Sequence, residues 1–316
     1  MRARIPAGVW RASVVQWPAG EPTSVLPQPV VMFGLRPGPR NGPAPLTIIC
    51  RMSKRPLPFV LAATDHGSLI VNRLDYRLTG ENSGFGVGYE LLTAGSFDLE
   101  EVNFALTMLT WRREFHGDGV FVVDCGANIG VHTVQWARHM TGWGNVLAIE
   151  AQERIFYALA GNIALNNCFN ARASNIAAGD VDGSMLIPQP DYTQPGSFGS
   201  LELIKSNGNE YIGQDIDYTP AAMKSVPVQR IDSLGIARVD FIKIDVEGME
   251  VAVLNGASEC IQRCKPYIFV EYTKSGGDRL TALLEGIGYK RWFFRNNLFA
   301  VPADDPCVAR LPAIGP

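Results

Sequence analysis

The sequence predicts an α/β protein built on a doubly wound, mostly parallel sheet with helices on both faces. Two observations lead to this fold class. Short apolar runs recur along the chain, most of them ending in an acidic residue, and segments with apolar residues at helical spacing separate them. Strands that alternate with helices in this way are typical of parallel sheets. The expected strands of the sheet are residues 119–124, 145–150, 172–176, 239–245 and 266–271.

Helices are expected between these strands. The segments with helical spacing are residues 130–140, 153–167, 250–264 and 280–289. The stretch between residues 177 and 238 has no sustained period and is expected to be irregular. Near the end of the chain, Asn296 and Asn297 join two short apolar runs, so we expect a closing hairpin of residues 291–294 and 298–301.

A smaller α+β layer is expected ahead of this sheet. Two apolar runs, residues 59–64 and 68–78, flank a short turn signal and predict a hairpin. Residues 80–88 are rich in glycine and are expected to form a loop, and residues 84–89 are a candidate lid over a ligand cleft. Residues 97–115 repeat apolar side chains at helical spacing, with Asp98 at the N-cap position, and predict a helix.

The first 51 residues differ from the rest of the chain in composition. They contain nine prolines, six arginines and one acid, so they carry a charge of +5 while the remainder carries −8. Proline disfavours helices and central strands, and here it interrupts every apolar stretch of the roughly 7–15 residues that a secretory signal needs. We therefore expect a disordered extension, and Met52 is a candidate natural start. The predicted organisation is an extension at 1–51, an accessory layer at 52–118, a main domain at 119–303 and a tail at 304–316.

Composition excludes several classes of protein. The net charge of −3, from 28 basic and 31 acidic residues, argues against a dedicated nucleic-acid binder, which usually has a basic excess. No apolar run approaches the roughly 18 residues of a membrane span. Six cysteines are too few for a disulfide scaffold, and their spacing does not predict a zinc site. We therefore expect free thiols, a cytoplasmic location and no resident metal, and we leave the oligomeric state open.

Four acidic residues stand at the ends of expected strands: Asp124, Glu150, Asp245 and Glu271. In doubly wound folds, ligands bind at the carboxyl ends of the strands. Four carboxylates gathered at one edge are unfavourable without a cation, so we expect a positively charged ligand or a metal there. The alternative is that these acids are simply solvated strand ends.

The turn after the first expected strand distinguishes between possible ligands. Gly126 and Gly130 permit a tight turn and a close approach of ligand to backbone, and Glu150 lies at the distance expected of a ribose-binding acid. A dinucleotide would place its pyrophosphate at this turn, where Asp124 would repel it. S-adenosylmethionine carries a sulfonium and an ammonium and no phosphate. The residue types therefore favour the methyl donor, with an NAD(P)-dependent oxidoreductase as the alternative.

Four motifs follow one another in the main domain: VVDCGANIGVHT (122–133), IEAQ (149–152), FIKIDVEGMEVAVLNGA (241–257) and IFVE (268–271). In order and spacing, over about residues 119–290, they resemble the FkbM family of S-adenosylmethionine-dependent methyltransferases. The resemblance implies a class I methyltransferase fold, with a seven-stranded sheet and one antiparallel strand. It also implies O-methylation of hydroxyl groups on sugars or secondary metabolites. The residues that match the family's central motif are Lys243, Asp245, Glu247, Gly248 and Glu250.

Cofactor contacts are assigned by position along the sheet edge. The expected cofactor-binding residues are Asp124, Gly126, Asn128, Gly130, Glu150, Ala151, Asn175, Ala177 and Asp245. Asp124 and Gly126 would bind the methionine end of the donor, and Glu150 the ribose hydroxyls. Asn175 and Ala177, after the third strand, would lie beside the adenine, with plain core packing as their alternative.

Methyl transfer to a hydroxyl requires alignment of two reactants and benefits from a general base. Asp245 and Glu247 follow the central strand, so we expect one of them to be the base, or both to bind a divalent cation together with Glu271. Lys243 shares a face with Asp245 because side chains alternate along a strand. It is either a charge partner of these acids or a second candidate base. His132, just inside the first helix, is a further catalytic candidate, with packing as its alternative.

The acceptor is expected beneath residues 191–203, a stretch of small, polar and aromatic residues between the third and fourth strands. The candidate substrate-binding residues are Tyr192, Phe198, Ser200 and Glu271. A purely structural loop is the alternative. Because no basic patch is present for a phosphorylated acceptor, we expect a small-molecule or carbohydrate hydroxyl compound. A non-catalytic module that binds the cofactor is the third class of function left open.

Overall fold

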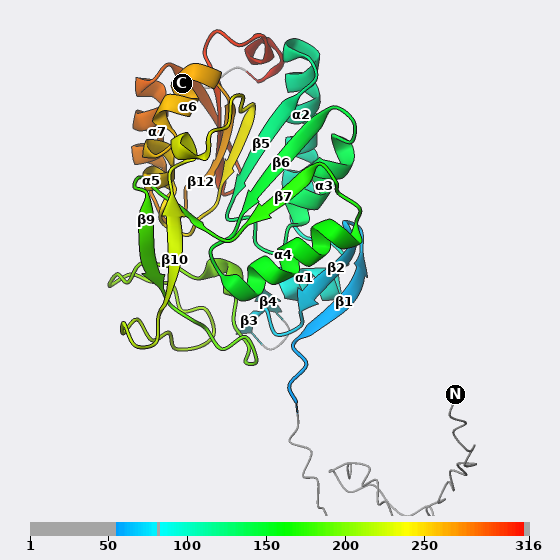
Figure 1. Ribbon diagram of the computed structural model, residues 1–316, viewed down its shortest axis with the longest axis vertical. Helices are drawn as coiled ribbons and strands as arrows, with labels where there is room; N and C mark the ends of the chain where they lie inside the picture. Colours follow the sequence, from blue (N-terminus) through cyan, green and yellow to red (C-terminus); the bar gives the residue numbers. More distant parts are fainter. Residues whose placement is uncertain (1–54, 81–82, 313–316) are drawn as a thin grey trace, which may run out of the picture. The chain divides into compact units, whose positions relative to one another are not determined.

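The structure is a computed structural model that describes residues 55–80 and 83–312. Seven strands form its central sheet: β5 (Val120–Cys125), β6 (Gly144–Ile149), β7 (Ala171–Ser174), β11 (Phe241–Ile244), β12 (Tyr267–Glu271), β13 (Tyr289–Phe294) and β14 (Asn297–Pro302). Their order in space is β13-β14-β12-β11-β5-β6-β7. Figure 1 labels β12, β5, β6 and β7 of this sheet. Neighbouring strands are parallel except in the two pairs that contain β14. The mostly parallel sheet with one antiparallel strand is confirmed, whereas the extension expected at residues 1–51 lies outside the described residues.

Successive side chains of β5 enter two different cores, one on each face of the sheet. Val122 belongs to the core beneath α2 (Leu99–His116), α3 (Val131–His139) and α4 (Glu153–Leu165). Val123 belongs to the core beneath α5 (Glu250–Asn255), α6 (Ser258–Cys264) and α7 (Gly277–Gly286). Because side chains alternate along a strand, a sheet covered on both faces needs strands that are apolar throughout. This explains the continuous apolar runs in the sequence.

Residues 250–264 form two helices, α5 and α6, so the prediction of one continuous helix is wrong. The chain bends at Gly256, where a Cβ would lie 1.9 Å from the backbone oxygen of Gly179. The second helix, α6, then begins with its own cap, because the Asp232 carboxylate accepts a hydrogen bond from the backbone N–H of Cys260 (2.7 Å). The interruption between α5 and α6 therefore lies where the backbones of Gly256 and Gly179 approach each other closely.

The stretch between residues 177 and 238 is more regular than expected. It contains β8 (Ala177–Ala178), β9 (Gly183–Ile187) and β10 (Lys224–Gln229), which form a separate sheet in the order β8-β10-β9. Pro227 lies inside β10, and a proline within an apolar run argues against a strand in sequence reasoning. Residues 188–223, called the cover segment below, connect β9 to β10 and contain the short 3-10 helix η1 (Phe198–Ser200).

The N-terminal layer contains the expected hairpin of β1 (Phe59–Thr64) and β2 (Gly67–Asn72). The second strand stops at Asn72 instead of residue 78, because the chain turns there and the buried Asp75 carboxylate accepts a hydrogen bond from the backbone N–H of Gly88 (3.2 Å). The loop expected at residues 80–88 is wrong for the described positions, which include the end of β3 (Arg77–Gly80), β4 (Ser83–Phe85) and the start of α1 (Val87–Thr93). A Cβ at Gly88 would lie 2.2 Å from the Asn72 backbone oxygen, so this glycine permits close packing.

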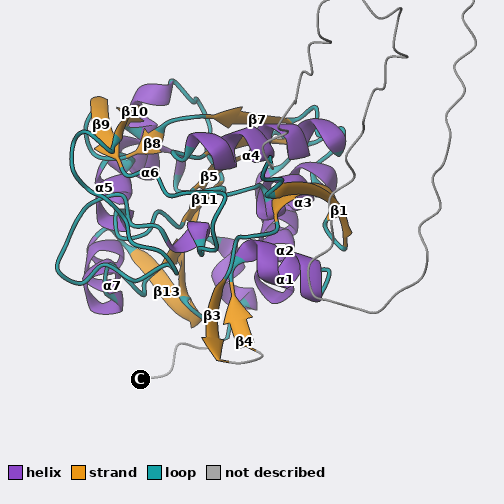
Figure 2. Cartoon of the chain, turned by 90° about the horizontal axis from the view of Figure 1, so that it is seen from below, coloured by secondary structure: helices purple, strands orange, loops and turns teal. Residues whose placement is uncertain are grey.

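The helix α2 agrees with the expected helix, but its cap does not. Asp98 occupies the N-cap position with a left-handed φ of 45°, and its side chain makes no capping hydrogen bond. Val102 and Leu109 of α2 pack in the same core as Val122 of β5. The N-terminal elements and the central sheet therefore share one core. Figure 2 shows α2 beside α3 from a second direction. The proposed domain boundaries stay predictions.

Two further observations bear on the exclusions made from composition. Within the described residues, no helix is long and apolar enough to cross a membrane. Five cysteines in this part of the chain are free thiols: Cys125, Cys168, Cys260, Cys264 and Cys307. The cytoplasmic location stays a prediction.

Candidate active site

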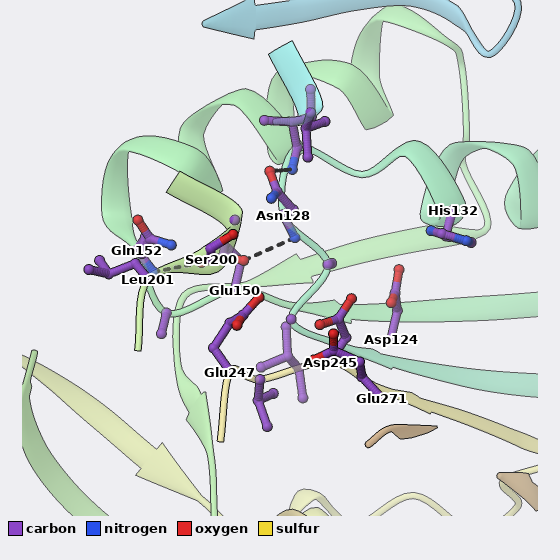
Figure 3. Close-up of a pocket in the computed structure, with 18 of the residues that line it drawn as sticks. Asp124, Asn128, His132, Glu150, Gln152, Ser200, Leu201, Asp245, Glu247 and Glu271 are labelled. Atoms are coloured by element: carbon purple, nitrogen blue, oxygen red, sulfur yellow. Dashed lines mark hydrogen bonds between the residues drawn. The ribbon is translucent and has the colours of Figure 1, made fainter. Parts of the chain in front are cut away.

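A pocket opens at the carboxyl edge of the central sheet, where β6, β5, β11 and β12 end (Figure 3). The four acidic strand-end residues all line it: Asp124, Glu150, Asp245 and Glu271. They meet because these four strands are parallel neighbours, so their carboxyl ends lie at one edge. The structure thus brings together the residues that the sequence singled out, while their individual roles stay predictions.

The turn from β5 into α3 leaves no room for side chains at its glycines. Gly126 lines the pocket with a φ of 77°, and a Cβ there would lie 1.7 Å from the backbone oxygen of Asp245. Gly130 precedes α3 with a φ of 89°, and a Cβ there would lie 2.6 Å from Leu159. Glycine is therefore required at both positions, and at Gly126 the bare backbone forms part of the pocket wall.

Asp124 is fully buried beneath this turn. Its Oδ2 accepts a hydrogen bond from Thr133 Oγ1 (2.6 Å), whereas Oδ1 has no hydrogen-bond partner among the described residues. Burial raises the pKa of this carboxyl, and the positive charge of Lys243 opposes the rise. A buried oxygen without a partner is costly, so Asp124 is suited to a positively charged ligand that supplies one.

Glu150 follows β6 and connects two turns (Figure 3). Its Oε2 accepts a hydrogen bond from the backbone N–H of Asn128 (2.9 Å), and its Oε1 accepts one from that of Gln152 (2.8 Å). Burial raises the pKa of Glu150 to about 7, although the two backbone hydrogen bonds oppose the rise. Each carboxylate oxygen has a second lone pair, so Glu150 can also accept hydrogen bonds from ligand hydroxyls.

The residues expected near the adenine and the turn differ in their access to the pocket. Ala151, Ala177 and Asn128 line it. Asn175 does not line it; its Nδ2 donates to the backbone oxygens of Glu150 (2.8 Å) and Ala151 (3.1 Å). Asn175 therefore supports the wall from behind, and a direct contact with a cofactor is not part of this arrangement.

Lys243 is a buried cation at the base of the pocket. Its Nζ donates to Asp245 Oδ2 (2.8 Å), and its side chain is only 4% exposed. Burial lowers the pKa of Lys243, but the negative charges of Asp245 and Asp124 outweigh burial and raise the pKa overall. A protonated amine has no lone pair with which to accept a proton. The geometry therefore favours the charge-partner interpretation of Lys243 over the catalytic one.

Three carboxylates at the ends of β11 and β12 form a compact group. One oxygen each of Asp245, Glu247 and Glu271 lies within 4.8 Å of the others. Oxygen ligands at this spacing could hold a divalent cation, which is the alternative that the sequence left open. In the structure, Lys274 forms an ion pair with Glu247, and Thr273 Oγ1 donates to Glu271 Oε1 (2.7 Å).

These carboxylates are electrostatically strained. Burial, followed by the charge of Asp245, raises the pKa of Glu247 well above its ordinary value. The same two causes raise the pKa of Glu271 to about 7. Glu250, the last acid of the central motif, has a different role, because its Oε1 accepts hydrogen bonds from the backbone N–H of Gly248 (3.0 Å) and so shapes the turn. Acidic groups therefore outnumber basic ones at this end of the pocket, where Lys243 and Lys274 pair with Asp245 and Glu247.

His132 lines the pocket at the end where Asp124 lies (Figure 3). It is 7% exposed, its Nε2 has no hydrogen-bond partner in the described part of the chain, and its ring lies 5.3 Å from the Trp136 ring. Burial lowers the pKa of His132 well below its ordinary value, so the imidazole is neutral at pH 7. The ring is therefore both a packed residue and an unpartnered polar group at the pocket.

The candidate substrate-binding residues separate into two pairs. Ser200 and Glu271 line the pocket, whereas Tyr192 and Phe198 do not. The Tyr192 hydroxyl donates to Gln152 Oε1 (3.0 Å), and the Tyr192 and Phe198 rings pack 4.8 Å apart. Phe198 is fully buried. These two aromatic residues therefore hold the cover segment in place, which is the structural alternative named for this stretch.

The N-terminal layer also lines the pocket. Phe85, Gly86 and Val87 come from the candidate lid at residues 84–89, whereas sequence reasoning missed Glu90, Phe97 and Asp98. Glu90 and Asp98 add two further acids to the carboxylate-lined wall. Burial raises the pKa of both side chains. No short motif marks these positions, and the one available signal, Asp98 before a helix, is equally typical of an N-cap.

The order of the sheet, the single antiparallel strand beside its edge and the acid-lined pocket at the carboxyl ends define a class I methyltransferase fold. Residues 124–291 match the model of the Methyltransferase FkbM domain family. The chain belongs to this family, and the resemblance seen in the sequence is confirmed.

Individual relatives agree with the family match. "Methyltransferase 1" of Beauveria bassiana (strain ARSEF 2860) is 30% identical over 186 residues, covering 54% of this chain and 73% of the relative. "Methyltransferase sdnD" of Sordaria araneosa is 27% identical over 192 residues, with the same coverage of each chain. A solved structure, methyltransferase FkbM from Methylobacillus flagellatus KT, is 18% identical with a TM-score of 0.42, covering 58% of this chain and 44% of that one.

Proposed function

We propose that this chain transfers a methyl group from S-adenosylmethionine to a hydroxyl oxygen of a small metabolite or a sugar. Membership of a methyltransferase family supports the methyl transfer and implies the donor. The observation that carries the proposal is Asp124, which is fully buried at the pocket with one carboxylate oxygen unpartnered among the described residues. Such an oxygen is suited to a cationic ligand.

The chemistry of the pocket fits the donor. S-adenosylmethionine carries an ammonium and a sulfonium, and the pocket offers Asp124 and Asp245 near one end of the glycine turn. Its ribose needs hydrogen-bond acceptors, which Glu150 provides at the neighbouring strand end. Its adenine needs apolar walls, which Ile176 and Ala177 provide. The pyrophosphate of a dinucleotide would face Asp124 instead, and no observation favours an oxidoreductase.

When bound, S-adenosylmethionine supplies an electrophilic methyl group on sulfur. The protein's contribution is mainly positioning, since the acceptor oxygen must lie in line with that methyl group. Asp124 and Glu150 fix two separate parts of the donor, so its orientation is set. The cover segment, through Ser200 and Leu201, and the N-terminal layer, through Phe97, enclose the opposite side of the pocket and limit the access of water.

One carboxylate oxygen is placed to accept the proton of an acceptor hydroxyl. Lys243 engages Asp245, and Lys274 engages Glu247. Glu271 Oε2 is buried at the pocket without a hydrogen-bond partner among the described residues. We therefore assign the proton-accepting role to Glu271, with Asp245 and Glu247 as its charged neighbours.

A transfer assay tests the proposed function. The protein is incubated with methyl-tritiated S-adenosylmethionine and a metabolite and glycan extract, and labelled products are identified by mass spectrometry. We expect the label in a methyl ether. Binding of the donor without transfer to any component would indicate a non-catalytic module, and a label on nitrogen or carbon would contradict O-methylation.

The affinity for the donor is expected to depend on pH through Glu150. Burial raises the pKa of Glu150 to about 7 in the free protein, and only its ionised form suits the donor's ribose hydroxyls and positive charge. Affinity should therefore increase roughly tenfold between pH 6 and pH 8 and then level off, following the ionised fraction. Calorimetric titration across this range measures it. Glu150→Gln should bind more weakly with a shallower profile, to which Glu271 still contributes, so an unchanged slope in that variant contradicts the assignment.

A further inference from the structure

Lys274 lies just beyond β12 and reaches the cover segment above the pocket. Its side chain is 16% exposed, and its Nζ donates to the backbone oxygen of Ser200 (3.0 Å). It also forms an ion pair with Glu247, which lines the pocket from the end of β11. A single ammonium group therefore joins the cover segment to the floor of the pocket.

Two further carboxylates of the cover segment face the same ammonium. Glu202 Oε1 lies 3.8 Å and Glu210 Oε2 lies 3.6 Å from Lys274 Nζ. Glu210 is also paired with Arg77 of β3 (3.0 Å). Glu202 in turn accepts a hydrogen bond from the backbone N–H of Glu210 (2.8 Å). Three negative side chains thus surround Lys274, and they would repel one another without it.

The cover segment forms a continuous part of the pocket wall. The residues that it contributes are Ser197, Gly199, Ser200, Leu201 and Leu203. Other contacts also hold this segment, and in one of them the Asp75 carboxylate accepts a hydrogen bond from the backbone N–H of Phe198 (2.9 Å). That contact joins the cover segment to the N-terminal layer, whereas Lys274 joins it to the strand ends where methyl transfer is proposed. Lys274 therefore acts on the side of the wall that lies nearest these strand ends.

We propose that Lys274 is a positioning residue that fastens the cover segment over the donor pocket and holds the Glu247 carboxylate in place. Loss of its charge leaves Glu202, Glu210 and Glu247 mutually repulsive, and the segment moves away from the pocket. The donor then loses part of its enclosing wall. The identity of the donor rests on the proposed function, but the fastening itself does not.

The test compares three variants of the full chain. Lys274→Met removes the charge, Lys274→Arg retains it, and Lys205→Met removes an exposed lysine from the same segment as a matched control. Calorimetry measures the dissociation constant for S-adenosylmethionine. Hydrogen–deuterium exchange of the ligand-free chain measures opening of residues 197–212, where the backbone N–H of Ser197 donates to the oxygen of Ile212 (2.7 Å).

We expect Lys274→Met to weaken donor binding about tenfold and to accelerate exchange in residues 197–212, with Lys274→Arg within about threefold of wild type and Lys205→Met unchanged. If residues 197–212 of the Lys274→Met variant exchange at the same rate as in the wild type, the proposal is overturned. An equal loss in the Met and Arg variants also overturns it, because the effect would then not depend on charge. If the wild-type chain fails to bind S-adenosylmethionine, the proposed function fails, and the exchange comparison still decides the role of Lys274.

Discussion

Asp124→Asn is expected to weaken the binding of S-adenosylmethionine about a hundredfold without lowering the free energy of unfolding. The buried carboxylate makes one hydrogen bond, from Thr133, and its other oxygen is unpartnered among the described residues. Burial raises the pKa of Asp124, which means that the surroundings disfavour its charge. The folded protein therefore keeps a charge that opposes its stability, and a cationic ligand is what would compensate for it.

The two measurements for this prediction are calorimetric titration with the donor and urea denaturation of the free protein. The amide of asparagine still accepts the Thr133 hydrogen bond, so the substitution removes the charge and little else. Asp118→Asn is the control, because Asp118 is exposed and its carboxylate pairs with Arg113 at the surface. A fall of more than about 2 kcal/mol in unfolding free energy would indicate a structural role for Asp124. Unchanged donor affinity would remove it from the binding site.

Much of the pocket could be predicted because it follows from local pattern and one general rule. The strands before Asp124, Glu150, Asp245 and Glu271 are mostly apolar, with Lys243 as a charged exception, since the sheet is covered on both faces. Once those strands are parallel neighbours, their ends must meet at one edge. The glycine turn could also be predicted from the sequence, because the position of Gly126 has no room for a Cβ and therefore requires glycine.

The rest of the pocket depends on contacts between distant parts of the chain. Lys274 meets Ser200 across 74 positions, and nothing in the local sequence of either residue indicates the pairing. Phe97 and Asp98 reach the pocket because α2 packs on the sheet, which no periodicity specifies. Tyr192 is a residue type that often contacts ligands, yet its hydroxyl donates a hydrogen bond to Gln152. Residue type predicts which chemistry is available, whereas tertiary packing decides which groups reach the ligand.

The same distinction applies to stability, where the largest expected effect lies away from the pocket. Asp240, directly before β11, is fully buried and joins three elements. Its Oδ2 accepts a hydrogen bond from the backbone N–H of Phe121 (2.9 Å), and its Oδ1 pairs with Arg112 Nε of α2 (2.9 Å). Arg112 is itself buried and pairs with Asp305 (3.2 Å). This network connects α2, β5 and the C-terminal part of the described chain.

Asp240→Ala is expected to lower the free energy of unfolding by about 3–5 kcal/mol, because it leaves the positive charge of the buried Arg112 guanidinium compensated only by Asp305. Urea denaturation measures the change. Asp240→Asn retains one acceptor for the Phe121 N–H and should lose less, which keeps the test usable if the Ala variant does not fold. Asp304→Ala breaks an exposed pair with Lys265 and should cost less than about 1 kcal/mol. Equal losses in the Asp240→Ala and Asp304→Ala variants would mean that burial does not set the strength of this ion pair.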